Sequence, residues 1–180
     1  LDQLFLSPSK LSLAERRHID QIFASIKAKL PPDAIQPKLI YRSSSFFGPN
    51  AFALPGNIVI LLDEMVEFAD DDDVIVGVLA HETGHVINQH AMRAVAQSMA
   101  IAIAVGLVFG IEDSFIEEIT TLSTSLILSN QSRKFETESD QVSLEILQKL
   151  GRLKLKLKYL AALGAKQFCQ CVLFCIATAN

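Results

Sequence analysis

Residues 77–85 read Gly-Val-Leu-Ala-His-Glu-Thr-Gly-His, and this stretch decides the fold and the chemistry that we expect. It contains the pattern H-E-x-x-H within an apolar run, which predicts a helix. On a helix, a spacing of four residues turns His85 only about 40° from His81, so both imidazoles project from one face. Such a pair can bind one zinc ion. Glu82 lies beside it, where it can activate the attacking water.

The pattern is short, so the surrounding sequence must support it. Four consecutive aspartates at positions 70–73 precede it and predict the capped start of a helix that begins near Val74 and runs to about Arg93. A calcium loop is the weaker interpretation, because the run lacks spaced oxygen ligands and a central glycine. Two partly buried structural histidines are a second alternative, which the intervening Glu82 makes less attractive.

A catalytic zinc ion takes three protein ligands and keeps one position open, so a third ligand is needed. The metzincin pattern would place glycine at position 88 and a third histidine at position 91. This chain has Asn88 and Ala91 there, and His90 is one residue short. On a regular helix His90 lies half a turn from His81. We therefore expect His90 to be a structural or surface residue.

A second segment offers carboxylates at a suitable spacing. Residues 133–140 read Arg-Lys-Phe-Glu-Thr-Glu-Ser-Asp, within a helix expected over 133–150. Glu136 and Asp140 share one face of this helix, whereas Glu138 lies about 200° from Glu136. Glu136 can ligate zinc, and Asp140 can accept a hydrogen bond from the distal nitrogen of a ligating histidine. Taken alone, this spacing is typical of a solvated helix face.

The residues before the histidine motif predict an amphipathic helix and a small sheet. We expect helices over 11–30 and 63–69, and strands over 38–42, 51–54 and 58–62. Ser12 with Glu15 three residues later predicts a capping box at the start of the first helix. Pro55-Gly56-Asn57 predicts a hairpin-like connection between the last two strands. Half of the 180 residues are apolar and 20% are charged, which fits one globular domain.

Three blocks of the sequence together resemble the gluzincin metallopeptidases. This group includes the HtpX-type heat-shock protease, the CAAX prenyl endopeptidase and the periplasmic beta-barrel-assembly-enhancing protease. The blocks are residues 50–56, residues 78–85, and Ser132-Arg133 with Glu136 and Asp140; their order and spacing cover roughly residues 35–151. The resemblance implies a mainly helical, zincin-like α+β domain with a small edge sheet beside the active-site helix.

The resemblance also implies a role for each site residue. It implies three ligands for one zinc ion per chain, a general base, and a carboxylate that orients a ligand: His81, His85 and Glu136, then Glu82, then Asp140. Asn50 and Ala51 would belong to the edge strand beside a polypeptide substrate, which can add to such an edge through main-chain hydrogen bonds. The implied activity is that of a zinc metalloendopeptidase acting on unfolded or membrane-associated proteins.

Residues 94–111 form an uncharged stretch at the lower edge of the roughly 20 residues that a membrane span needs. We expect a buried or membrane-surface helix pair here, with a span as the alternative. The resemblance implies membrane association, through this segment or through segments outside the catalytic core. It also implies a periplasmic or membrane-facing location, with this chain a soluble fragment of a longer protein.

Charge separates the end of the chain from the rest. The net charge of −4 gives no basic face, so we expect no nucleic-acid partner. Residues 152–180 carry five basic residues and no acidic one, and their first part alternates with period two. We expect a catalytic domain over 1–151 and an atypical basic and apolar tail over 152–180, in the same domain or poorly ordered. Its three cysteines at 169, 171 and 175 favour ordinary thiols over a metal site.

An alternative function from another class is a latent, zinc-stabilised chaperone or a membrane-anchored binding module. Glu82 favours the enzyme, because a structural zinc site needs no general base and usually fills its fourth position with a protein ligand.

Overall fold

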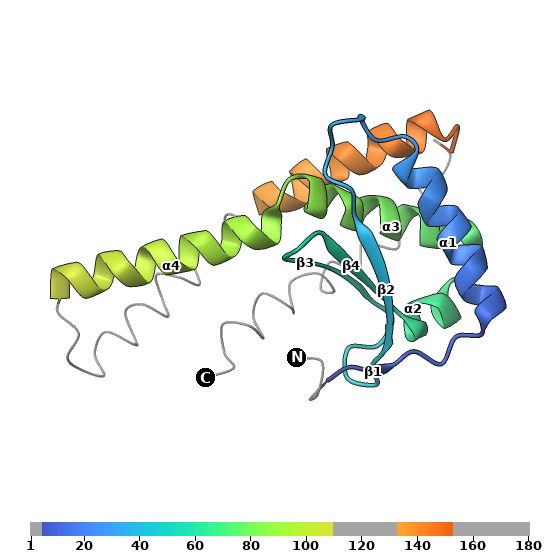
Figure 1. Ribbon diagram of the computed structural model, residues 1–180, viewed down its shortest axis with the longest axis horizontal. Helices are drawn as coiled ribbons and strands as arrows, with labels where there is room; N and C mark the ends of the chain where they lie inside the picture. The colour runs from blue at the N-terminus through green and yellow to red at the C-terminus, as the bar shows by residue number, and fades with distance from the viewer. Residues whose placement is uncertain (1–4, 110–132, 153–180) are drawn as a thin grey trace.

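The computed structural model describes residues 5–109 and 133–152 (Figure 1). The helices are α1 (Leu13–Lys27), α2 (Asp63–Phe68), α3 (Asp72–Ile87) and α4 (His90–Phe109), and the strands are β1 (Ser7–Pro8), β2 (Lys38–Ser43), β3 (Ala51–Leu54) and β4 (Ile58–Leu62). A further helix covers residues 133–149 and is called the 133–149 helix. The α+β class is as the sequence predicts. The predictions for the tail beyond Arg152 and for the three cysteines fall outside the described residues.

The four strands form one mixed sheet in the order β1-β2-β4-β3. Strands β2 and β4 are parallel, whereas β3 and β4 are antiparallel neighbours joined by residues 55–57. Gly56 (φ 87°) and Asn57 (φ 65°) are both left-handed, the conformation that tight hairpin turns require. The predicted hairpin is therefore confirmed, and β3 lies at one edge of the sheet.

Both predicted helix starts are present. The hydroxyl of Ser12 accepts from the backbone N–H of Glu15, whose carboxylate accepts from the N–H of Ser12, and these two bonds form the capping box of α1. Asp71 caps α3 by accepting from the N–H of Val74 at 3.2 Å. The following aspartates occupy the first turn of α3, where negative charge complements the helix dipole.

Helix α3 ends at Ile87, so the prediction that it continues to about Arg93 is wrong. Asn88 is its C-cap, and the Asn88 side chain donates to the carbonyl oxygen of Gly84 at 3.1 Å. Gln89 then adopts a left-handed φ of 53°, and a new helix begins at His90. A left-handed residue after the C-cap is a common way to end a helix. Here no glycine or proline marks the break.

Helix α4 extends away from the sheet as one continuous helix rather than a helix pair (Figure 1). Ala94 is buried, but Met99 and Ile103 are 61% and 62% exposed. The expected burial of residues 94–111 is therefore wrong at Met99 and Ile103. Residues 110 and 111 lie outside the described part. In the described ranges, no helix has the length and apolarity to cross a bilayer. The membrane-surface alternative stays a prediction.

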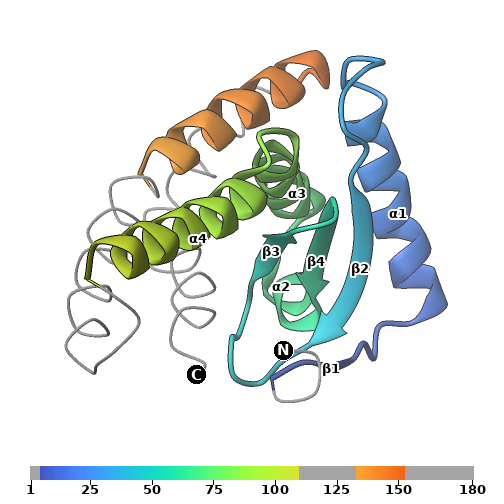
Figure 2. The ribbon, with the colours of Figure 1, turned by 60° about the vertical axis from the view of Figure 1, so that its left-hand side comes forward.

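Helix α3 is fixed between the sheet and the 133–149 helix, as the two ribbon views show (Figures 1 and 2). Strand β4 is apolar on both faces, and Val59 and Leu61 join the core that contains Leu79 of α3 and Leu147 of the 133–149 helix. Full burial of such a side chain contributes about 1.5–3 kcal/mol. The core therefore holds the histidine-bearing helix in a fixed orientation.

Candidate metal centre

The side chains of His81 and His85 project from one face of α3, as predicted from their spacing. Both are buried, and their Nε2 atoms lie 3.0 Å apart. Because the two rings are inclined at 73° to one another, neither stacks on the other. Both Nε2 atoms thus face the same small region beside the helix.

Glu136 of the 133–149 helix faces this region. Its Oε2 lies 3.2 Å from Nε2 of His81, and its Oε1 lies 3.4 Å from Nε2 of His85. The three side chains form a group that could hold a metal ion, with ligand atoms within 4.8 Å of one another. Residues from two helices that are 51 or more positions apart in sequence therefore meet at one point.

The two helices cross at Ser139, which is buried and donates from Oγ to the carbonyl oxygen of His81 at 2.5 Å. The accepting carbonyl lies in the middle of α3. The bond therefore fixes the position of the 133–149 helix along α3, so that Glu136 lies opposite the two histidines.

Asp140 lies within hydrogen-bond distance of His81. Its Oδ1 lies 3.1 Å from Nδ1 of His81. A carboxylate can only accept, so Nδ1 carries the hydrogen in this pair. In the neutral imidazole, Nε2 of His81 then presents a lone pair toward Glu136 and His85.

His90, Glu138 and Arg93 lie beside the centre, although the sequence predicts that His90 faces away from it. Nδ1 of His90 is 2.8 Å from Nδ1 of His85, and Nε2 of His90 is 3.0 Å from Oε2 of Glu138. The same oxygen accepts from Arg93 at 2.8 Å. The prediction fails because it assumes one regular helix, whereas the break at Gln89 turns His90 back toward His85. Three histidines within ten residues are the one sequence signal that hints at this contact.

Burial favours the neutral forms of His85 and His90. It lowers the pKa of His85 to about 3, with the neighbouring His81 acting in the same direction. Burial also lowers the pKa of His90. Hydrogen bonds from His90 and then Arg93 lower the pKa of Glu138 to about 2. Neutral imidazoles therefore meet ionised carboxylates at neutral pH.

Burial and the neighbouring histidines act in opposite directions on the pKa of Glu136. Burial alone would raise the pKa of Glu136, but the proximity of His81 and then of His85 brings it below its usual value. An ionised carboxylate that faces two imidazole lone pairs is an arrangement that a shared positive charge, a metal ion above all, stabilises.

The donor set fits a zinc ion. A tetrahedral ion with bonds of about 2.0–2.1 Å has ligand atoms about 3.3 Å apart, by the geometry of a tetrahedron. The three separations here are 3.0, 3.2 and 3.4 Å. Two imidazoles and one carboxylate are also a combination found at catalytic zinc sites, where the fourth position stays open.

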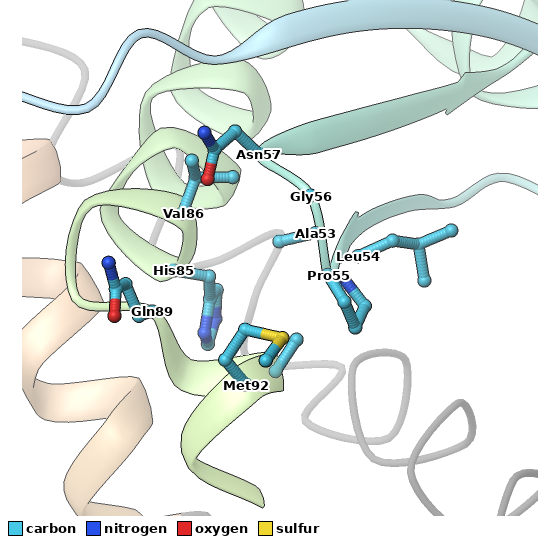
Figure 3. A pocket seen from close by; sticks show the side chains of 10 residues that line it. Ala53, Leu54, Pro55, Gly56, Asn57, His85, Val86, Gln89 and Met92 are labelled. Carbon is cyan, nitrogen blue, oxygen red and sulfur yellow. The ribbon is translucent and has the colours of Figure 1, made fainter. Parts of the chain in front are cut away.

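A cavity of about 240 Å³ adjoins the centre (Figure 3). It lies between the β3–β4 turn and the α3–α4 junction, and its lining comprises residues 53–57, His85, Val86, Gln89, Ala91 and Met92. Figure 3 shows His85 and Met92 facing the turn residues across it. One wall of the cavity is therefore a residue of the centre itself.

The remaining predicted site residues lie on α3 and at the start of β3. Glu82 is buried on α3, next to His81 in sequence. Asn50 directly precedes the edge strand β3 and Ala51 begins it, and both are buried, at 7% and 3% exposed. They are absent from the cavity lining, which begins at Ala53.

The chain is similar to a known protein family and to three curated proteins. A profile described as peptidase family M48 matches residues 14–169. Mitochondrial metalloendopeptidase OMA1 of Schizosaccharomyces pombe is 32% identical over 99 residues, which are 55% of this chain and 29% of that protein. The Saccharomyces cerevisiae protein of the same name is 30% identical over 99 residues (55% and 28%), and that of Arabidopsis thaliana 25% over 104 residues (57% and 21%).

These matches span less than a third of the length of the three curated relatives. The family match is broader, because residues 14–169 include both helices of the metal centre and most of the chain. It confirms the resemblance to metallopeptidases that the three sequence blocks indicate. The chain belongs to peptidase family M48.

Proposed function

We propose that residues 1–151 form the catalytic domain of a zinc-dependent metalloendopeptidase of the gluzincin type. The observation that carries this proposal is the convergence of His81 Nε2, His85 Nε2 and the Glu136 carboxylate within 4.8 Å. The Nδ1 atoms of both histidines are engaged on the far side, which leaves their Nε2 lone pairs for a metal ion. The name metalloendopeptidase, carried by the three relatives, supports the same activity.

The chemistry that a bound zinc ion supplies at such a site is polarisation of a carbonyl and acidification of a water. Glu82 is the residue that we assign to proton transfer, because it lies next to His81 and is the carboxylate of the H-E-x-x-H pattern. It takes a proton from the attacking water and later delivers it to the leaving amine. Within the described ranges the metal group has three members, which is consistent with an open fourth position.

We place the polypeptide substrate along β3. This strand is at the edge of the sheet, so an extended peptide can add to it through main-chain hydrogen bonds, starting beside Asn50 and Ala51. The cavity at the other end of the strand, bounded by Ala53, Leu54 and Met92, suits an apolar side chain of that peptide. Because such a site binds a peptide in an extended conformation, we favour unfolded or membrane-associated proteins as substrates and a role in protein quality control.

We further propose that α4 lies on a membrane surface. Its exposed apolar side chains include Val95, Met99 and Ile103, which recur at spacings of four residues on one side of the helix. Sedimentation with phosphatidylcholine vesicles tests this. The parent should co-sediment, and the variant Met99→Glu/Ile103→Glu should remain in the supernatant. Equal sedimentation of both would contradict the proposal.

Hydrolysis of casein by the zinc-loaded full chain tests the proposed activity. Glu82→Gln keeps the size of the side chain but removes the group that takes the proton, so the rate should fall by roughly 10² to 10⁴. Zinc content should be unchanged, because this substitution leaves all three ligands in place. Glu67→Gln is the matched control, since Glu67 is an exposed glutamate of α2.

Two results would overturn the mechanism. Parental activity in Glu82→Gln would remove the general base from the scheme. A zinc-loaded parent without chelator-sensitive hydrolysis would instead favour the latent, zinc-stabilised module.

A further inference from the structure

His90 connects the metal centre to a carboxylate that is not part of it. Its ring is buried, with Nδ1 2.8 Å from His85 Nδ1 and Nε2 3.0 Å from Glu138 Oε2. Arg93 donates to the same oxygen of Glu138 at 2.8 Å. Four side chains therefore form one continuous hydrogen-bonded chain that ends on a metal-binding histidine.

The hydrogens in this chain can be assigned from one end. Glu138 is an ionised carboxylate held by Arg93, so it accepts, and His90 must carry its hydrogen on Nε2. In the neutral imidazole, Nδ1 of His90 is then an acceptor. The contact at 2.8 Å requires one donor, so His85 carries its hydrogen on Nδ1. The lone pair of His85 is then on Nε2, 3.0 Å from the Nε2 lone pair of His81. A cation between these two acceptors, such as the proposed zinc ion, stabilises this arrangement.

We propose that His90, together with Glu138 and Arg93, is a positioning relay that locks His85 in the tautomer able to bind the metal. The proposal rests on the proposed zinc centre and adds to it. His81 is oriented by Asp140 directly, whereas His85 is oriented by Glu138 through an intervening imidazole. In both histidines the hydrogen is thus held on Nδ1 and the lone pair on Nε2, by a direct carboxylate contact for His81 and by a relay for His85.

Packing holds the relay in place independently of its hydrogen bonds. The ring of His90 stacks on Phe135, with centroids 4.3 Å apart and an angle of 11° between the planes. The guanidinium of Arg93 lies 4.6 Å from the centroid of the same phenyl ring. Phe135 directly precedes Glu136. The ring that stacks on His90 therefore belongs to the same helical turn as the proposed third ligand.

A purely structural role for His90, as a link between α4 and the 133–149 helix, makes a different prediction. Loss of such a link would lower stability but leave the hydrogen of His85 where it is. The tautomer of His85 in the metal-free protein therefore separates the two roles. It can be measured from the long-range proton–nitrogen couplings of the imidazole ring in the ¹⁵N-labelled full chain.

The key variant is His90→Phe, which keeps a ring against Phe135 but offers His85 no acceptor. We expect His85 to shift from the Nδ1–H form toward the Nε2–H form, which can donate to Nε2 of His81 at 3.0 Å in the metal-free protein. Zinc affinity, measured by competition with a chelator, should fall about 10- to 100-fold, the usual effect of removing a group that orients a ligand. His90→Asn, whose amide oxygen can accept from His85, should recover part of the affinity.

His18→Phe is the matched control, because His18 makes an equivalent contact with Asp72, at 2.8 Å, on the exposed side of α1. It should leave the tautomer and the affinity unchanged. If His90→Phe does not fold, Glu138→Leu interrupts the relay at its more exposed end and should shift His85 in the same direction. An unchanged tautomer and a zinc affinity within about twofold of the parent, in whichever variant folds, would overturn the relay. A parent that binds no zinc would overturn the metal centre instead, whatever the tautomer.

Discussion

Gly84 and Ser139 approach so closely that a β-carbon on Gly84 would lie 2.6 Å from Oγ of Ser139 and 2.7 Å from its backbone oxygen. Real side chains do not tolerate such distances, so the two helices could not keep their present separation with any larger residue at position 84. The glycine within the H-E-x-x-H pattern thus determines how near Glu136 can come to the histidines.

Gly84→Ala should therefore weaken both the fold and the metal centre. Overpacking of this kind costs about 1–3 kcal/mol, and displacement of the 133–149 helix should lower zinc affinity as well. Denaturant unfolding of the metal-free protein and zinc titration measure the two effects. Adding Ser139→Gly should not restore either value, because the backbone oxygen and the Cα atom of residue 139, the latter 2.9 Å away, remain in the way. Full restoration by the double variant would contradict this account.

The neighbouring position should respond in the opposite way. Thr83 is completely buried, and its Oγ1 has no hydrogen-bond partner among the described residues. An unpaired buried hydroxyl costs about 1–3 kcal/mol, so Thr83→Val should leave the free energy of unfolding equal or higher. Zinc affinity should not change. A loss of stability on this substitution would mean that the hydroxyl has a partner.

Asp140→Asn should affect metal binding without affecting proton transfer. The amide is a weaker acceptor for Nδ1 of His81 than the carboxylate 3.1 Å away. We expect zinc affinity to fall about 10- to 100-fold, and activity to return toward the parental rate when excess zinc is added. In Glu82→Gln, by contrast, excess zinc should restore nothing. The pair of titrations separates the carboxylate that orients a ligand from the one that moves a proton.

The metal-free protein should lose stability as the pH falls from about 7 toward 4. Burial lowers the pKa of His85 from 6.5 to about 3, so the unfolded chain binds a proton there that the folded chain does not. Stability then rises with pH between these two values and falls as the pH is lowered through them. His85→Gln removes this group, so its free energy of unfolding should depend less on pH over the same range. An equal slope in both proteins would show that other groups dominate.

Much of the fold and most of the proposed centre could be predicted, because they depend on local rules. Ser12 and Asp71 cap their helices where short-range hydrogen bonding requires it, and Gly56-Asn57 supplies the hairpin turn. The common face of His81 and His85 follows from helical periodicity alone. These features need no knowledge of what packs against them.

Other features depend on long-range packing, and the sequence does not reveal them. The break after α3 occurs at Gln89, a residue with no preference for a left-handed φ. The contact between His90 and Glu138 follows from that break and from the placement of a helix that lies far along the chain. Likewise, an apolar run such as residues 94–109 is equally compatible with burial and with the exposure observed at Met99 and Ile103.

The assembly of one centre from α3 and the 133–149 helix links metal binding to folding. A metal ion held by His85 and Glu136 would close a loop of 51 residues, as a disulfide does, and would be bound by the folded chain only. At a free ion concentration of about 100 times Kd, such a ligand stabilises the native state by about 2.7 kcal/mol. Chelation would therefore lower the melting temperature of the whole domain, and the supply of metal would regulate the lifetime of the protein as well as its chemistry.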